Sequence, residues 1–153
     1  MQQRFTERVE KVVKLANVIA REFEQDYVGT EHILLAIHRE GTGMGARILI
    51  ERGITAERLK AEIEKLMRKS LEDTWVFGRL PGTPHFRNVV ATALDEAQKM
   101  NSDQLHTEHL VLALLREEGS VAYHALKNLG CDLESVRADI LASLSNDDAT
   151  RTG

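Results

Sequence analysis

An internal repeat constrains the fold of this sequence more than any other feature. A shift of 77 positions places Thr30 on Thr107 and, with it, the run Thr-Glu-His-Ile-Leu-Leu-Ala on Thr-Glu-His-Leu-Val-Leu-Ala. The same shift places Gly53 on Gly130, and it holds without insertions along the repeat. A single offset of this kind indicates a tandem duplication of one supersecondary unit. We therefore predict one domain over 1–144, divided into repeat one (6–69), a linker (70–82) and repeat two (83–144), with a flexible tail over 145–153.

Within each half, apolar residues recur every three or four positions, which is the period of an amphipathic helix. The fold class is therefore predicted to be all-α, with eight helices arranged as two tandem pseudo-twofold four-helix repeats. Gly53 and Gly130 suit the left-handed residue that follows a helix, and Leu35 and Leu112 should be buried at equivalent positions. The predicted helices begin at Thr6, at Thr30 and Thr107, near 44 and 120, near Thr55 and Asp132, and at Thr83-Pro84.

Composition excludes several classes of partner. The net charge of −4 and the pI near 5.9 give no basic surface for nucleic acid or an anionic membrane. No segment has the apolar length of a membrane-spanning helix or the pattern of a signal peptide. The single cysteine, Cys131, is interpreted as a buried apolar residue in a reducing environment, and we expect a cytoplasmic protein that is monomeric in isolation.

Motifs of catalysis are missing from the sequence. It contains no phosphate-binding loop of the form Gly-x-x-x-x-Gly-Lys-Ser/Thr and no Gly-x-Ser-x-Gly turn. His106 and His109 with Glu108 are the nearest approach to a metal cluster, but they lack the His-Glu-x-x-His arrangement. We interpret His32 and His109 as structural residues that donate hydrogen bonds near their helix starts. The prediction is a binding protein with no catalytic residue, no metal and no cofactor.

Several motifs resemble one known family. They are the opening Arg-Phe-Thr-Glu-Arg at 4–8, Tyr-Val-Gly-Thr-Glu-His at 27–32, its second copy at 107–109 and Thr83-Pro84. Together they resemble the duplicated amino-terminal domain (Clp N repeat) of AAA+ unfoldases of the ClpC/ClpA type. The resemblance implies a domain that captures substrate proteins or peptides and adaptor proteins, and hands them to a Clp ATPase ring and protease.

The ClpC branch also implies a ligand, phosphorylated arginine, with one site in each repeat. By position, Glu31 and Glu108 would bind the guanidinium, since a carboxylate accepts two hydrogen bonds from that planar group. In repeat one, Thr6 and Arg8 at the start of the first helix suit the phosphate. In repeat two the corresponding residues are Thr83 and His85.

The second site departs from the family pattern, because the family commonly has arginine where this chain has His85. A mostly neutral imidazole should hold a phosphate more weakly than Arg8 does. A second interpretation is that Glu31 and Glu108 only stabilise their helix N-termini, by about 0.3–1 kcal/mol each.

One alternative to the docking function remains open for the whole chain, which is a stand-alone accessory subunit that stabilises a Clp protease complex without recognising substrates. A separate question concerns Trp75-Val76-Phe77 in the linker. This segment either covers a groove between the halves or forms an exposed docking patch.

Overall fold

The structure is a computed structural model that describes residues 5–25, 28–75 and 84–147, with the backbone alone at 68–75, 84–86 and 144–147. Over these ranges the chain forms eight helices and no strand, which confirms the predicted all-α class. A single parallel β-bridge joins Phe5 to Leu105. In chain order the helices are α1 (Glu7–Glu22), α2 (Thr30–Glu40), α3 (Met44–Glu51), α4 (Ala56–Trp75), α5 (Pro84–Lys99), α6 (Thr107–Arg116), α7 (Val121–Asn128) and α8 (Leu133–Asp147).

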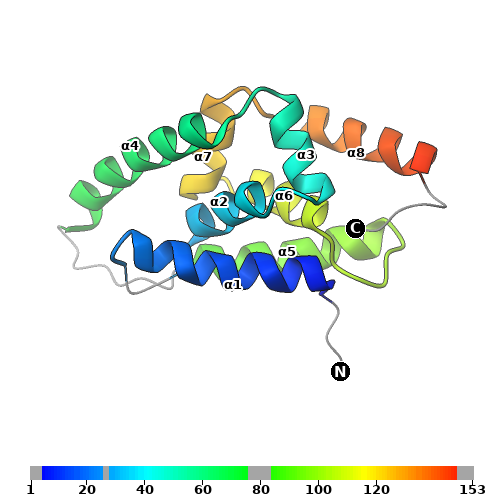
Figure 1. Ribbon diagram of the computed structural model, residues 1–153, viewed down its shortest axis with the longest axis horizontal. Coiled ribbons are helices and arrows are strands. Elements are labelled where there is room, and N and C mark those ends of the chain that lie inside the picture. The colour runs from blue at the N-terminus through cyan, green and yellow to red at the C-terminus, as the bar shows by residue number, and fades with distance from the viewer. Residues whose placement is uncertain (1–4, 26–27, 76–83, 148–153) are drawn as a thin grey trace.

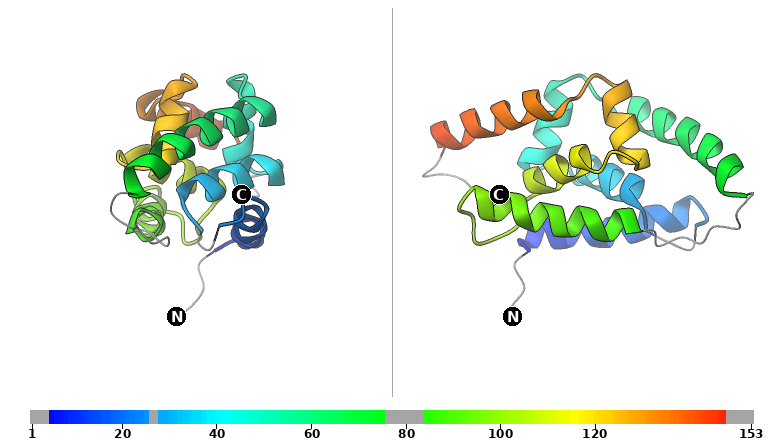
Figure 2. Two further views of the ribbon diagram at one scale, coloured as in Figure 1. Left: turned by 90° about the vertical axis from the view of Figure 1, so that its left-hand side faces the viewer. Right: turned by 180° about the vertical axis from the view of Figure 1, so that it is seen from behind.

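Helices α2 and α6 form the centre of the molecule (Figure 1). Every residue from 30 to 37 and from 107 to 115 is buried, so both helices are enclosed on all sides. The apolar runs Ile33–Ile37 and Leu110–Leu115 explain most of this burial, because a helical segment that is apolar all round is stable only inside a core. Helices α1 and α5 run in opposite directions below this central pair, and α3, α4, α7 and α8 lie above it (Figures 1 and 2).

The two repeats pack against each other through equivalent contacts. The backbone N–H of Gly45, at the start of α3, donates to Thr107 Oγ1 at 2.9 Å. The backbone N–H of Ala122, which corresponds to Gly45 in the second repeat, donates to Thr30 Oγ1 at 3.3 Å. A reciprocal exchange of this kind is what a twofold axis produces. Each repeat therefore supplies a threonine whose hydroxyl accepts a hydrogen bond from a backbone N–H at the start of the other repeat's third helix.

The last helix of each repeat also crosses to the other repeat. On one side Arg52 Nη1 donates to Asp139 Oδ2 at 2.9 Å, which joins α8 to the end of α3. On the other side Asn128 Nδ2 donates to Glu62 Oε2 at 2.6 Å, which joins α7 to α4. Because of this crossing, neither four-helix unit buries its apolar face alone, and the two repeats share one core.

Several predicted details can be compared with the structure. Leu35 and Leu112 are buried, and Gly53 and Gly130 have φ angles of +78° and +87°, as expected for residues that end helices. Cys131 is buried, and burial raises the pKa of its thiol to about 11.

The boundaries of two predicted segments differ from the structure. Helix α4 continues to Trp75 and α8 to Asp147, so the helices extend into the predicted linker and tail. The predicted role of the segment 75–77 lies outside the described side chains.

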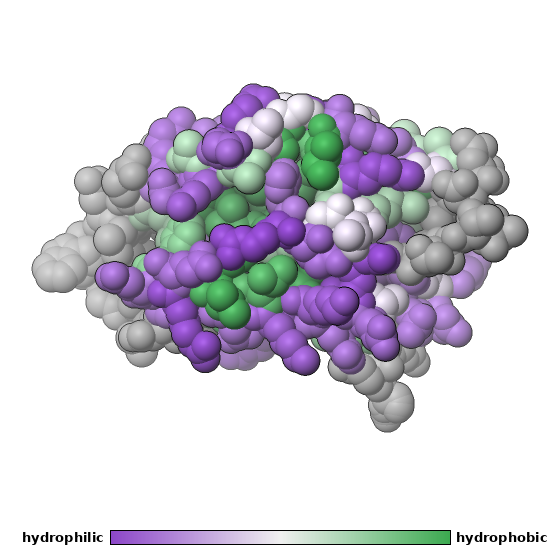
Figure 3. All heavy atoms as spheres, viewed as in Figure 1, coloured by the Kyte–Doolittle hydropathy of each residue, from purple (hydrophilic) through white to green (hydrophobic). Residues whose placement is uncertain are grey.

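Hydrophilic side chains cover most of the face shown in Figure 3, and small apolar areas lie between them. Among the described residues, the large apolar side chains that are exposed are Val18, Ile50 and Leu141, each on a different helix. None of the helices in the described ranges is long and apolar enough to cross a membrane.

Candidate functional site

The start of α1 lies beside the segment that leads into α6. The backbone N–H of Thr6 donates to the carbonyl of Leu105 at 3.2 Å, next to the bridge between Phe5 and Leu105. A methyl group added to Gly43 would lie 2.5 Å from Thr107 Oγ1 and 2.8 Å from Arg8 Cδ. The first helix of repeat one, its third helix and the second helix of repeat two therefore meet at one place.

This geometry changes how the predicted site residues are paired. The sequence alignment pairs Thr6 and Arg8 with Glu31, in the same repeat. The contacts above instead bring Thr6 and Arg8 to Thr107, which directly precedes Glu108. The physical reason is the packing of the repeats, since α1 begins at the end of the molecule where the loop from α5 to α6 lies (Figure 2).

The predicted phosphate-binding residues already have protein contacts. Thr6 Oγ1 accepts from the backbone N–H of Val9 at 3.1 Å and so caps α1, as predicted. The Nε of Arg8 donates to Thr42 Oγ1 at 2.9 Å and lies 3.7 Å from Glu40 Oε2, and the arginine side chain is 25% exposed. Thr83 lies outside the described residues, and His85 is described only as part of the backbone of α5.

Both predicted guanidinium ligands are buried. Glu31 is 4% exposed and Glu108 is 0% exposed. Each is the second residue of its helix, after Thr30 or Thr107, where a negative charge interacts favourably with the helix dipole. A methyl group on Gly29 would lie 2.8 Å from Glu31 Oε1, so this carboxylate folds back over the backbone before its helix. A ligand could reach either carboxylate only after that side chain turns outward.

The histidines that follow the glutamates cap the same helices. The backbone N–H of Gly29 donates to His32 Nδ1 at 2.8 Å, and that of His106 donates to His109 Nδ1 at 2.9 Å. Each Nδ1 therefore accepts a hydrogen bond, whereas the predicted donation is made, in His32, by the other ring nitrogen, Nε2, to Gln25. Burial lowers the pKa of both His32 and His109 to about 4, so both rings are neutral at pH 7.

The metal cluster considered at 106–109 has no counterpart in the geometry. Within the described ranges, no group of three histidine, cysteine, aspartate or glutamate residues is arranged to hold a metal ion.

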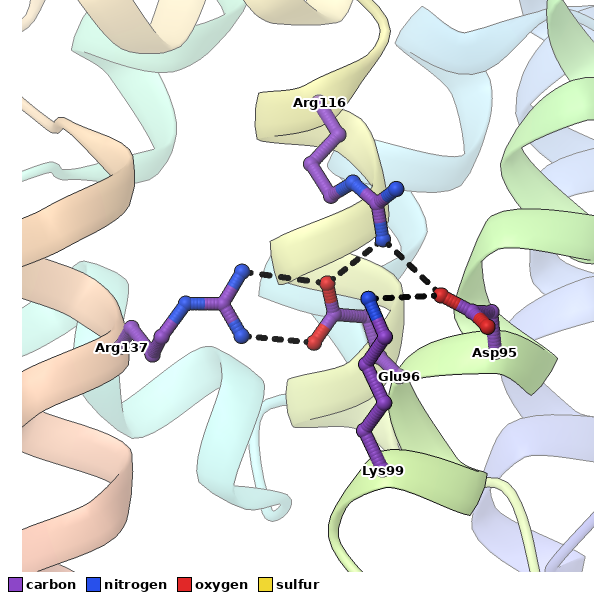
Figure 4. A network of polar contacts seen from close by, with 5 residues as sticks. All are labelled: Asp95, Glu96, Lys99, Arg116 and Arg137. Carbon is purple, nitrogen blue, oxygen red and sulfur yellow. Dashed lines mark hydrogen bonds and ion pairs between the residues drawn. The ribbon is translucent and has the colours of Figure 1, made fainter.

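Sequence reasoning missed a charged cluster around Glu96 (Figure 4). Glu96 is 0% exposed and occupies the position of Ile19 in repeat one. Arg137 donates to both of its oxygens, at 2.8 and 3.1 Å, and Arg116 donates to Oε2 at 2.8 Å. Burial would raise the pKa of Glu96, but the hydrogen bonds from the two arginines outweigh it and hold the pKa below its ordinary value. The cluster joins α5, α6 and α8.

The signal for this cluster is present in the alignment of the repeats. A carboxylate replaces a core isoleucine, and arginine replaces lysine at the position of Lys60. A substitution of this kind inside a core requires a paired charge.

Comparison with known proteins agrees with the duplication. The Clp repeat (R) N-terminal domain family matches residues 4–76 and 81–152, once for each repeat. The chain belongs to this family. The resemblance inferred from the Thr-Glu-His motifs is thereby confirmed.

Relatives of this Clp repeat domain occur in ATP-binding subunits of Clp proteases and in chaperone proteins. The chain is 38% identical over 141 residues to the chloroplastic chaperone protein ClpC1 of Arabidopsis thaliana, covering 92% of this chain and 15% of that protein. It is 36% identical over 153 residues to a ClpA homologue, an ATP-dependent Clp protease ATP-binding subunit, of Cyanidium caldarium, covering 100% of this chain and 18% of that protein. The chain thus spans less than one fifth of the length of these relatives.

A solved structure has the same fold. The N-terminal domain of the Clp protease-associated chaperone ClpD from Arabidopsis thaliana superposes with a TM-score of 0.70 at 21% identity, over 92% of this chain and 97% of that one.

Proposed function

We propose that this Clp repeat domain is a substrate- and adaptor-docking module of a Clp-type unfoldase and protease system. The observation that carries the proposal is the match of both repeats to a family found in the ATP-binding subunits of Clp proteases. The partners would be substrate proteins or peptides, adaptor proteins, and the Clp ATPase ring and protease. The domain itself would be non-catalytic and monomeric. We retain a cytoplasmic location in the proposal, although the Arabidopsis relative is chloroplastic.

We propose that the domain recognises phosphoarginine on its substrate proteins. The arrangement that supports this is the meeting of Arg8 and the α1 N-terminus with the start of α6, where Glu108 lies. A cation beside a helix N-terminus suits a phosphate, and a carboxylate suits a guanidinium. We propose a composite site, with Thr6 and Arg8 from repeat one and Glu108 from repeat two. By the 77-residue offset, Thr83 and His85 would be the phosphate residues of a second site with Glu31, and their side chains lie outside the described part of the chain.

The burial of the glutamates sets the expected affinity. Because a ligand must first turn the carboxylate outward, only the open fraction of molecules binds, and the apparent dissociation constant rises by the inverse of that fraction. Each charge-assisted contact then contributes about 1.5–3 kcal/mol. We expect Glu108→Ala or Arg8→Ala to weaken one site about tenfold to a hundredfold.

Calorimetric titration of phosphoarginine into the wild type and the variants tests the proposal. If the composite pairing is right, Glu108→Ala and Arg8→Ala remove the same site and their effects do not add, whereas Glu31→Ala and Arg8→Ala add. Arginine without phosphate is the matched control ligand. An absence of heat with phosphoarginine at millimolar concentration would refute this part of the proposal.

The alternative is a stand-alone accessory subunit that stabilises a Clp protease complex without reading substrates. Its specific support is the burial of Glu31 and Glu108, which favours a structural role for both. Under this alternative the domain would co-purify with an assembled Clp protease and stabilise it. Substrate degradation would then be unaffected when Glu31 and Glu108 are both replaced.

A further inference from the structure

A pocket of about 250 Å³ opens between the C-terminal end of α5 and the loop that leads to α6. Leu94, Ala97 and Leu105 give it apolar walls, and Gln98, Ser102 and Asp103 are among its polar lining residues. A concave apolar site with a few polar groups is the usual form of a binding pocket. This volume is sufficient for a side chain of a partner.

His109, which follows in sequence the loop that lines this pocket, carries a buried hydrogen-bond donor. His109 is 0% exposed, and its Nδ1 accepts from the backbone N–H of His106. In the neutral ring the remaining proton is therefore on Nε2. Within the described part of the chain, this Nε2 has no hydrogen-bond partner. A buried donor without an acceptor is costly and rare in folded proteins.

The first repeat shows what an equivalent donor binds. There His32 Nε2 donates to the side-chain oxygen of Gln25 at 2.6 Å. The position equivalent to Gln25 is Ser102, which lines the pocket and is too short to reach in the same way. The hydroxyl of Ser102 donates instead to the carbonyl of Gln104 at 2.6 Å. Repeat one thus gives its histidine a carboxamide of its own, whereas the equivalent position in repeat two is a serine that lines the pocket.

We propose that this pocket receives a glutamine side chain from a partner peptide, whose carboxamide oxygen accepts a hydrogen bond from His109 Nε2. The inference rests on the proposed docking function and names the peptide chemistry that a second site would select. The methylene groups of the glutamine would lie against Leu94 and Ala97, as an apolar stem does in an apolar pocket.

Charge defines the peptide further. Asp103 is the one ionisable side chain among the pocket's lining residues, so a lysine or arginine next to the glutamine is favoured. Glutamate, which has nearly the same shape as glutamine, is disfavoured. Its charge would have to leave water to reach a ring that is 0% exposed, which costs far more than the burial of a neutral carboxamide.

Peptide titration followed by NMR tests the assignment. The probe is Ala-Ala-Gln-Lys-Ala-Ala, and the matched controls carry glutamate or leucine in place of glutamine. We expect the glutamine peptide to bind at least tenfold more tightly than either control and to shift the His109 Nε2 resonance. Equal binding of the leucine peptide, or an unshifted His109 resonance at saturation, would overturn the proposal.

A single substitution adds a second, independent test. Ser102→Gln gives repeat two the carboxamide of repeat one. It should therefore raise the melting temperature of the domain and lower its affinity for the glutamine peptide at least tenfold. The matched variant Gln25→Ser should lower the melting temperature and leave that affinity unchanged. If Ser102→Gln binds the peptide like the wild type, the site is wrong. If the wild type binds adaptor or substrate proteins but no glutamine peptide, docking stands and this pocket assignment alone falls.

Discussion

Two buried histidines should make this domain sensitive to mild acid. Burial lowers the pKa of His32 and His109 to about 4, from 6.5. The folded state keeps both rings neutral, whereas the unfolded chain takes up a proton on each below pH 6.5. The unfolded state therefore binds more protons between pH 6.5 and 4, and stability is lost as the pH falls through that window.

The size of the effect follows from the shifts. One pKa unit corresponds to about 1.4 kcal/mol, so each histidine contributes about 3 kcal/mol in full and about 2 kcal/mol of this is lost by pH 5. Both together should lower the free energy of unfolding by about 4 kcal/mol between pH 7 and 5, a large part of the usual 5–15 kcal/mol. Glu22, Asp95 and Glu96, whose pKa values are lowered, lose their contributions only at lower pH.

Urea unfolding at pH 7, 6 and 5 measures this loss directly. The variant His124→Gln, at an exposed position, is the control and should show the same loss as the wild type. NMR titration of the imidazole rings should show His32 and His109 still neutral at pH 5. A free energy of unfolding that changes by less than about 1 kcal/mol over this range would refute the reasoning.

Two further predictions concern charge and packing in the second repeat and at its contact with the first. Arg137→Ala leaves the buried carboxylate of Glu96 with one guanidinium, so we expect a loss of about 3 kcal/mol in urea unfolding. Glu96→Gln should cost less, because the guanidinium of Arg137 is 36% exposed and can turn to water; a larger cost would contradict this account. Gly45→Ala would place a methyl group 2.9 Å from the Thr107 carbonyl, and should lower the free energy of unfolding by about 1–3 kcal/mol. Ala122, its counterpart, should tolerate replacement by serine far better. Equal losses in the free energy of unfolding for the two variants would show that the close approach of Gly45 to Thr107 does not set the cost.

The sequence predicts the fold well because the fold depends on repeated local patterns. The features that determine the helices are local in sequence. They are the helical periodicity, the Thr6 cap and the glycines at 53 and 130, and each affects only the few residues next to it. The boundaries at 69 and 145 are harder to predict, since a helix can continue wherever no proline or glycine stops it, and α4 and α8 both do so.

The arrangement of the candidate site could not be predicted in the same way. Which repeat supplies Arg8 to which glutamate depends on how the repeats dock, and the alignment of one repeat on the other contains no information on docking. The same holds for Thr30 and Thr107, which look like helix caps in sequence. Each is instead the first residue of its helix, and its hydroxyl binds the opposite repeat.

The duplication leaves two kinds of position with different physical roles. Where both copies retain a residue, as at Thr30 and Thr107, the contact is reciprocal and serves the shared core. Where the copies differ, the second repeat has gained chemistry that the first lacks: Glu96 replaces a core isoleucine, and Ser102 replaces a glutamine that satisfied a buried histidine. Each change adds a cost to the folded state, which Arg116 and Arg137 offset for Glu96. No group in the described structure accepts a hydrogen bond from His109 Nε2 in place of a glutamine at position 102. We therefore infer that a side chain of a partner does so.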